Sequence, residues 1–416
     1  MASENVLLEG HIIDALTLPK VLDEIVERGA TFEIIELSIG VKHDDESFAR
    51  IRVSADGEDE LMKLIDGLRQ HGANAETIED AQLAKADIEG SFPPGFYSST
   101  NLETDIRVDG KWIPVTHPEM DCGIVLEAGE ARTIPMAEVR KGMRIVMSGL
   151  GIRVSPPERP RDEARHAFGF MSSDVSSEKP KALLVEQVAE QMRQVHTAGR
   201  RIMWVAGPAV VHTGSAPDLC ALIRAGFVNA FFAGNGVATH DIESNIFGTS
   251  LGVSLSLGAP AEQGHEHHIR AINEVRRHGS FRQAIDGGLF DDGVVYHLVK
   301  HEVPYLFGGS VRDDDPLPEV VTEMLEVQTQ LRRLIWGSEG DDLVGFCIVV
   351  GTMLHGIATG NCLPASVPLV CVDINQATVT KLMDRGSFQS MGIITDVGLF
   401  VRELSELLAP DEIRRS

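Results

Sequence analysis

The stretch that most constrains the fold of this chain runs from Asp342 to Leu382. It contains two short apolar runs, Leu343–Val350 and Leu369–Ile374, which are typical of parallel strands buried on both faces. Asp373 lies near the end of the second run, about 20 residues beyond Gly351, which is the spacing of a dinucleotide-binding βαβ unit. In such a unit the acid accepts the ribose hydroxyls and the backbone N–H groups of the turn face the pyrophosphate. The three-glycine fingerprint is absent, so a parallel sheet with an ordinary strand-end aspartate stays an alternative.

Composition excludes several classes of partner. The formal net charge of −25, from 62 acidic and 37 basic residues, argues against binding to nucleic acid or to anionic membranes, because both need basic surfaces. The five cysteines are scattered without a CxxC pair, which favours free thiols in a reducing cytoplasm. The acidic N-terminus does not resemble a signal peptide, and no apolar run approaches membrane-spanning length.

The order of predicted elements indicates an α/β protein with three domains. Residues 1–91 show a β-α-β-β-α order, which predicts a ferredoxin-like or ACT-like α+β module or a plain structural domain. Residues 92–160 contain short strands with glycine turns and predict a small β domain, with a hairpin at Asp109-Gly110. The proline- and serine-rich residues 161–180 predict a linker. Residues 181–416 alternate helix and strand, with helices expected at residues 216–224 and 318–333, and predict a parallel-sheet domain.

Several predicted strands of this last domain end at glycines, notably Gly207, Gly234, Gly308 and Gly351. Because ligands of open parallel sheets bind at the carboxyl ends of the strands, the sequence predicts a binding site along this edge.

Polar residues near these strand ends are the candidates for catalysis and ligand binding. The segment 234–240, GNGVATH, predicts a glycine turn after a strand and contains Asn235. His240-Asp241 is either a polarised imidazole or simply a helix N-terminus. His355 follows the central strand and either faces a ligand or is a buried, hydrogen-bonded histidine. The segment 264–268, GHEHH, suggests a metal, but zinc needs three or four converging ligands and no further spacing supports one, so no metal is expected. The sequence assigns no role to Cys122 or to the cluster of His265, His267 and His268.

Longer motifs carry a resemblance that covers essentially the whole chain. They include GFYSSTN, FGFMSSDVSSEKP, GPAVVHTGS, GNGVATHDIESNIFGTSLG, GSVRDDDPLPEV, GTMLHGIATGN and VCVDINQATVTKLMDRGS. With these motifs the chain resembles the archaeal-type ornithine cyclodeaminases, which also form the C-terminal part of cyanobacterial bifunctional arginine dihydrolase/ornithine cyclodeaminase proteins. The N-terminal part resembles the LOR/SDH (lysine-ketoglutarate reductase/saccharopine dehydrogenase) conserved region. The C-terminal domain also resembles the NAD-binding fold of deoxyhypusine synthase, which implies a dinucleotide site without the usual glycine fingerprint.

The resemblance implies an enzyme that binds NAD and converts ornithine to proline and ammonia by lending a hydride to the cofactor and taking it back. Gly236 stands where the family pattern has alanine, and the smaller residue leaves the backbone contact possible. The NAD contacts that the resemblance implies are Asn235, Gly236, Asp313, Thr352, Met353, Leu354, His355, Asp373, Asp396 and Val397.

Candidates for proton transfer and for holding the diamine are His240, Asp241 and Asn101. A homo-oligomer is also expected. Two alternatives remain open: a saccharopine- or opine-type NAD-dependent dehydrogenase, and a non-catalytic sensor of NAD or an amino acid.

Overall fold

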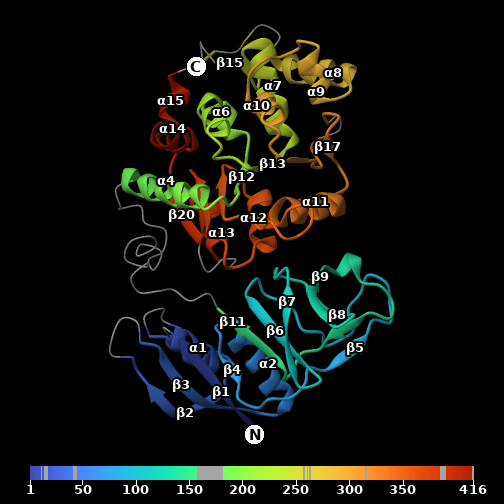
Figure 1. Cartoon of the computed structure of the whole chain (residues 1–416), viewed down its shortest axis with the longest axis vertical. Coiled ribbons are helices and arrows are strands. Elements are labelled where there is room, and N and C mark those ends of the chain that lie inside the picture. The colour runs from blue at the N-terminus through green and yellow to red at the C-terminus, as the bar shows by residue number, and fades with distance from the viewer. Residues whose placement is uncertain are drawn as a thin grey trace. The chain divides into compact units, whose positions relative to one another are not determined.

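The chain folds into two compact units in a computed structural model. One unit comprises Met1–Ser172 with Asn361–Ser366, and the other comprises Ser173–Gly360 with Val367–Ser416 (Figure 1). The structure describes residues 1–10, 12–13, 17–40, 45–156, 181–255, 258–259, 261, 264–313, 316–384 and 390–414. The predicted linker, residues 161–180, lies outside the described residues.

The first unit begins with a sheet in the order β2-β3-β1-β4, in which all neighbouring strands run antiparallel. Residues of β3 alternate, with Ala49, Ile51 and Val53 buried and Arg50 and Arg52 on the opposite face. The elements of this part are β1 (Ala2–Gly10), α1 (Thr17–Glu27), β2 (Thr31–Ser38), β3 (Ser47–Ala55), α2 (Glu58–Arg69) and β4 (Asn74–Ala75).

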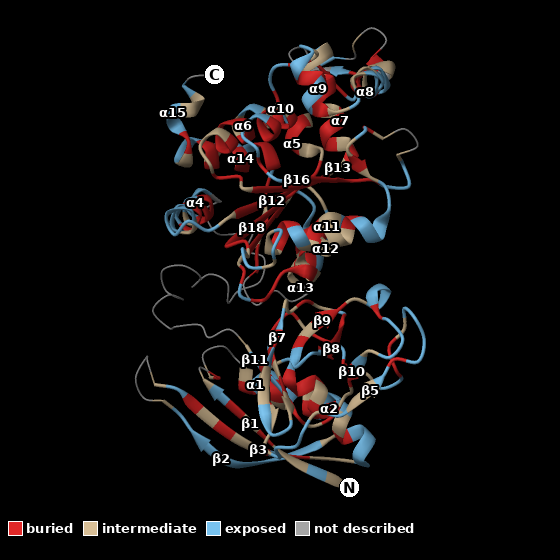
Figure 2. Cartoon of the chain, turned by 45° about the vertical axis from the view of Figure 1, so that its right-hand side comes forward, coloured by how far each residue is buried: buried red, intermediate tan, exposed pale blue. Residues whose placement is uncertain are grey.

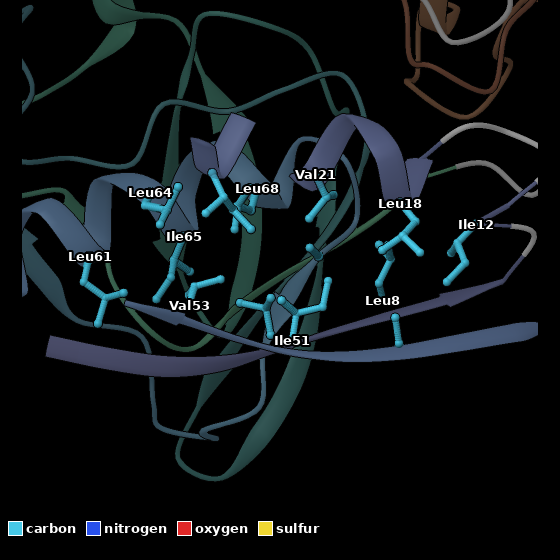
Figure 3. Packing of buried hydrophobic residues seen from close by; sticks show 14 residues of the cluster. Leu8, Ile12, Leu18, Val21, Ile51, Val53, Leu61, Leu64, Ile65 and Leu68 are labelled. Carbon is cyan, nitrogen blue, oxygen red and sulfur yellow. The ribbon is translucent and has the colours of Figure 1, made fainter. Parts of the chain in front are cut away.

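Two helices cover the buried face of this sheet. Helix α1 buries Leu18, Val21 and Ile25, which follow one another at helical spacing. Figure 3 shows Leu18 and Val21 of α1 and the labelled side chains of α2 pointing toward the sheet, where Ile51 and Val53 belong to the same buried cluster. Complete burial of one such aliphatic side chain contributes about 1.5–3 kcal/mol, so this cluster stabilises the module.

A second sheet completes the first unit, in the order β11-β6-β7-β9-β8-β10-β5. The predicted hairpin at Asp109-Gly110 is confirmed, because both residues have positive φ angles (49° and 77°) and join paired strands. The strands are β5 (Leu83–Lys85), β6 (Glu103–Val108), β7 (Lys111–Thr116), β8 (Gly123–Glu127), β9 (Glu130–Ile134), β10 (Arg144–Val146) and β11 (Ile152–Ser155).

The second unit is built on a parallel sheet in the order β17-β16-β13-β12-β18-β19-β20. Figure 2 shows its central strands in red, because β12 and β18 are buried along their whole length. The strands are β12 (Ile202–Ala206), β13 (Ala230–Gly234), β16 (Tyr305–Gly308), β17 (Val320–Val321), β18 (Phe346–Val350), β19 (Leu369–Asp373) and β20 (Ser390–Ile394). The predicted mixed α/β fold with a C-terminal parallel sheet is therefore confirmed.

Helices cover both faces of this sheet, with α11, α12 and α13 on one side and α6 and α14 on the other (Figures 1 and 2). Residues 318–333 were expected to form one helix, but Val320–Val321 pairs with β16 as β17 and the helix begins only at Met324. The helices are α4 (Lys181–Thr197), α5 (Ala209–His212), α6 (Ala216–Arg224), α7 (Asn235–Phe247), α8 (His267–His278), α9 (Phe281–Asp286), α10 (Val294–Lys300), α11 (Met324–Trp336), α12 (Leu354–Cys362), α13 (Gln376–Asp384), α14 (Val397–Leu408) and α15 (Pro410–Ile413). In the part of the chain that the structure describes, no helix combines the length and apolar character needed to cross a membrane.

Candidate active site

The order of the strands predicts a ligand-binding crevice between β12 and β18. From β12 the chain adds β13, β16 and β17 on one side, and it then returns to add β18, β19 and β20 on the other. Ligands of open parallel sheets bind where the strand order reverses in this way, outside the carboxyl ends of the strands.

Two glycines let the backbones approach closely at this reversal. A Cβ atom added to Gly207, after β12, would lie 1.9 Å from the carbonyl oxygen of Gly351, after β18. Gly351 has a φ angle of 61°, and a Cβ atom there would lie 2.9 Å from Cβ of Ala209. A larger residue at either position would push the two strand exits apart.

A hydrogen bond between an amide and a carboxylate joins the segments that follow β13 and β16. Asn235 is the first residue of α7 and is buried; its Nδ2 donates to Oδ1 of Asp313 at 2.9 Å. The other oxygen of Asp313 accepts the backbone N–H of Ser310 at 2.8 Å. Next to Asn235, a Cβ atom on Gly236 would only touch Pro208, at 3.4 Å. The predicted residues Asn235, Gly236 and Asp313 therefore lie on neighbouring strand exits.

His355 packs across the same exits. Its ring lies 4.6 Å from the ring of Phe232, and its Cε1 lies 3.0 Å from where a Cβ atom on Gly234 would be. Burial lowers the pKa of His355, and the charge of Asp313 offsets this only in part, so the imidazole is neutral at pH 7.

The segment Thr352–Leu354 leads from β18 into α12. The side chains of Met353 and Leu354 are exposed, at 37% and 73%. The first backbone N–H groups of a helix have no partner within the helix, so this segment presents donors at the sheet edge.

Aspartates lie at the carboxyl ends of β19 and β20. Oδ1 of Asp373 accepts the backbone N–H of Asn375 at 2.7 Å, and its Oδ2 accepts no hydrogen bond from a residue that the structure describes. Asp396, after β20, is exposed and caps α14 by accepting the N–H of Leu399 at 2.9 Å, while Val397 is buried.

The three residues predicted for catalysis have different surroundings. Asp241 lies inside α7 and is completely buried; it accepts the backbone N–H groups of Val294 and Val295, at 2.9 and 2.8 Å, at the start of α10. These contacts favour a structural role for Asp241. Asn101 belongs to the first unit, where its Nδ2 donates to the carbonyl oxygen of Leu363 at 3.2 Å.

His240, about one and a half turns further into α7 than Asn235, belongs to a polar network that the sequence patterns did not reveal. Its Nδ1 lies 2.8 Å from Oε2 of Glu243, which is completely buried. The ring of His212 lies 4.8 Å from the ring of His240, and Nδ1 of His212 lies 2.7 Å from Oγ of Ser250.

The network continues through β14 (Thr249–Ser250), which pairs with β15 (Val253–Ser254). The hydroxyl of Thr249 donates to Oε1 of Glu243 at 2.9 Å and lies 2.8 Å from Nδ1 of His267. His267 of the GHEHH segment is thus part of a hydrogen-bonded chain.

Comparison with known proteins agrees with this arrangement. The model of "Arginine dihydrolase ArgZ-like, C-terminal, Rossmann fold" matches residues 186–404, its first region matches residues 103–185, and the LOR/SDH bifunctional enzyme conserved region matches residues 3–102. An ornithine cyclodeaminase of Methanopyrus kandleri is 46% identical over 403 residues, which is 96% of this chain and 96% of that protein. The chain belongs to the archaeal-type ornithine cyclodeaminase family.

Solved structures of this family include that of ArgZ, an arginine dihydrolase from the ornithine-ammonia cycle in cyanobacteria, with a TM-score of 0.84 and 36% identity. The match covers 98% of this chain and 58% of ArgZ, so this chain spans little more than half the length of that protein. AgrE, solved as a ternary complex with ornithine and NAD+, has a TM-score of 0.52 and 36% identity, over 98% of this chain and 58% of AgrE.

A metal is not favoured by the groups that the structure brings together. Among the described residues, Cys220, Asp292 and His297 approach one another closely enough to hold an ion. However, Nη1 of Arg224 lies 3.1 Å from Nε2 of His297, and a guanidinium at this position repels a cation.

Proposed function

We propose that this chain is an NAD-dependent ornithine cyclodeaminase that converts L-ornithine to L-proline and ammonia, an ammonia-lyase reaction. The observation that carries the proposal is the 46% identity to an ornithine cyclodeaminase along almost the whole of both chains. The structure of AgrE with ornithine and NAD+ supports the same substrate and cofactor for this chain.

The residues at the carboxyl edge fit a dinucleotide. Oδ2 of Asp373, which accepts no hydrogen bond from a described residue, suits a ribose hydroxyl, and the helix-start donors of Thr352–Leu354 suit a pyrophosphate. The amide of Asn235 and the neutral ring of His355 supply further polar contacts without adding charge. The residues proposed to hold NAD are Asn235, Gly236, Asp313, Thr352, Met353, Leu354, His355, Asp373, Asp396 and Val397.

Bound NAD supplies a hydride acceptor that can return the same hydride, so the reaction consumes no cofactor. The protein must release the substrate amines from their protonated form and keep water away from the imine until the ring closes. His240 is proposed to take part in proton transfer, because its ring is held by Glu243 and lies about one and a half turns from Asn235. Asp241 is proposed to support the site structurally, and Asn101 stays a candidate for holding the diamine.

Finer features of the fold are also proposals. The antiparallel order β2-β3-β1-β4 supports a ferredoxin-like or ACT-like module for residues 1–91, followed by the small β domain of residues 92–160. The resemblance of residues 181–416 to deoxyhypusine synthase, a homo-oligomeric assembly and a cytoplasmic location are proposed on the family resemblance.

Incubation of the protein with ornithine and a trace of NAD tests the proposal. A cyclodeaminase forms proline and ammonia in amounts far above the NAD added. A saccharopine- or opine-type dehydrogenase instead needs NAD in proportion to its product, and a sensor forms no product. Either result would overturn the proposal.

A further inference from the structure

His212 has an open nitrogen at the reversal of the strand order. It ends α5, the short helix that follows Gly207, and its side chain is only partly buried. Nδ1 is engaged by the hydroxyl of Ser250, and Nε2 has no hydrogen-bond partner among the residues that the structure describes. When Nδ1 carries the hydrogen and donates it to Ser250, the lone pair of Nε2 is available to a ligand.

Building on the proposed cyclodeaminase function, we infer that His212 accepts a proton from the substrate ammonium group and later returns it, with Glu243 as a positioning residue acting through His240. Sequence patterns alone do not single out His212 or Glu243, because the rings of His212 and His240 meet only where α5 and α7 pack together.

The groups around His212 keep it in the proton-accepting form. Burial, and then the neighbouring His240, lower the pKa of His212, while Glu243 opposes the shift. These two groups face it from α7. Helices α6 and α14 also pack against α5. Asp218 of α6 accepts the hydroxyl of Ser405, Asp396 caps α14, and α14 itself also carries the charged residues Arg402, Glu403 and Glu406. The imidazole of His212 is therefore neutral at pH 7.

Glu243 fixes the second ring of the pair. Its Oε1 accepts the hydroxyl of Thr249 and the N–H of Gly252, both at 2.9 Å, and its Oε2 accepts from His240. Burial alone would raise the pKa of Glu243, but its hydrogen bonds, first that with His240, outweigh this and lower the pKa. The carboxylate thus stays ionised and holds Nδ1–H of His240 in one orientation.

The proton step balances without a further reactant. The N–H bond of the substrate α-ammonium breaks, its electron pair stays on the amine nitrogen, and a new N–H bond forms at Nε2 of His212. The free amine can then supply the electron pair that forms the imine as the hydride leaves Cα. After the ring closes, His212 gives the proton to the departing ammonia, which leaves as ammonium.

The kinetic test compares His212→Asn with the wild type. Asparagine retains a donor for Ser250 and lacks Nε2, so kcat should fall about 100- to 10,000-fold while NAD affinity, measured by calorimetry, stays within about twofold. His196→Asn is the matched control. His196 packs on Phe227, which precedes β13 and therefore lies at the amino ends of the strands, whereas the proposed site lies at their carboxyl ends. In His212→Ala, added imidazole should restore part of the activity. Wild-type kcat and an unchanged pH profile in His212→Asn would overturn the inference.

A second readout needs neither substrate nor cofactor. The ring of His212, assigned in NMR spectra by comparison with His212→Asn, should titrate below the usual histidine pKa in the wild type. Its pKa should rise in His240→Asn and fall in Glu243→Gln, because these changes remove a group that lowers it and a group that raises it. An unchanged titration in both variants would contradict the pairing.

The two proposals fail in different ways. If the wild-type protein forms no proline from ornithine, the proposed function and this inference both fall. If the wild type is active and His212→Asn is equally active, only the role of His212 falls.

Discussion

The carboxylate of Asp373 is expected to contribute to cofactor binding and not to the chemical step. One of its oxygens accepts the backbone N–H of Asn375, and the other has no hydrogen-bond donor among the described residues near the end of β19. Asp373→Ala removes one charge-assisted hydrogen-bonding group, which should cost about 1.5–3 kcal/mol of NAD binding, or about a tenfold to hundredfold loss of affinity. Because this ribose contact is distant from the reacting carbon, turnover at saturating NAD should stay near the wild-type value. A hundredfold lower plateau with unchanged NAD affinity would place Asp373 at the reacting centre instead.

The same carboxylate should select between cofactors. A phosphate on the 2′ oxygen of the ribose would be repelled by Asp373, and its chain neighbours Val372, Ile374 and Asn375 offer no positive charge. We therefore expect NAD to bind more tightly than its 2′-phosphorylated form. The two dissociation constants are measured by calorimetry in the same buffer, and equal values would show that Asp373 does not contact the ribose.

Asp241 should make stability depend on pH. Burial raises its pKa from 3.8 to about 7, against the effect of the two backbone N–H groups from Val295 and Val294. The folded protein therefore binds one more proton than the unfolded chain between about pH 4 and pH 7, and this contribution to stability is lost as the pH rises through about 7. Asp241→Asn cannot ionise, so its melting temperature relative to the wild type should be higher at pH 8 than at pH 5. A difference that is the same at both pH values would mean that Asp241 is ionised throughout this range.

Gly207 and Gly351 allow the ends of β12 and β18 to meet where the strand order predicts the crevice. In Gly207→Ala the new Cβ atom would strike the backbone of Gly351, and relief of this overlap should cost about 1–3 kcal/mol and widen the crevice. We expect a lower melting temperature and weaker NAD binding. Gly360→Ala in α12 is the control: its nearest neighbour would be 3.9 Å away, and alanine should stabilise the helix by up to about 1 kcal/mol. Equal melting temperatures for the two variants would contradict the close approach.

Elements with strong local patterns could be predicted from the sequence. The apolar run at Leu369–Ile374 became β19 (Leu369–Asp373), and Ala216–Arg224 forms α6 with the predicted bounds. Strand β17 could not be found in this way, because its two residues gain their partner only from β16. The glycine segment after β13 was expected to be a turn, but α7 begins directly at Asn235.

Candidate site residues could be predicted from the sequence where each one directly follows a single predicted strand. Asn235, Asp313, His355 and Asp373 all lie at the carboxyl edge, as the glycine exits suggested. The histidine network depends on residues from α5, α7 and β14 that meet only in space. One signal was present: Glu243 follows His240 at a spacing that places both on one helix face.

The division of the molecule into two units makes the location of NAD binding testable for the whole chain. All residues proposed to hold NAD lie in the second unit, after β13, β16, β18, β19 and β20. In hydrogen exchange followed by mass spectrometry, NAD should slow exchange in peptides that contain the exits at Gly234, Gly308 and Gly351. Exchange in residues 1–100 should not change, because a ligand stabilises the part of the protein that binds it.

Asp373→Ala at the same NAD concentration provides the control for this experiment. Its lower affinity should reduce the protection at all three exits together, since one bound dinucleotide touches them all. Protection in the wild type that appears within the first hundred residues and not at these exits would place the cofactor in the N-terminal module. That result would overturn the site at the reversal between β12 and β18, whatever the reaction that the protein catalyses.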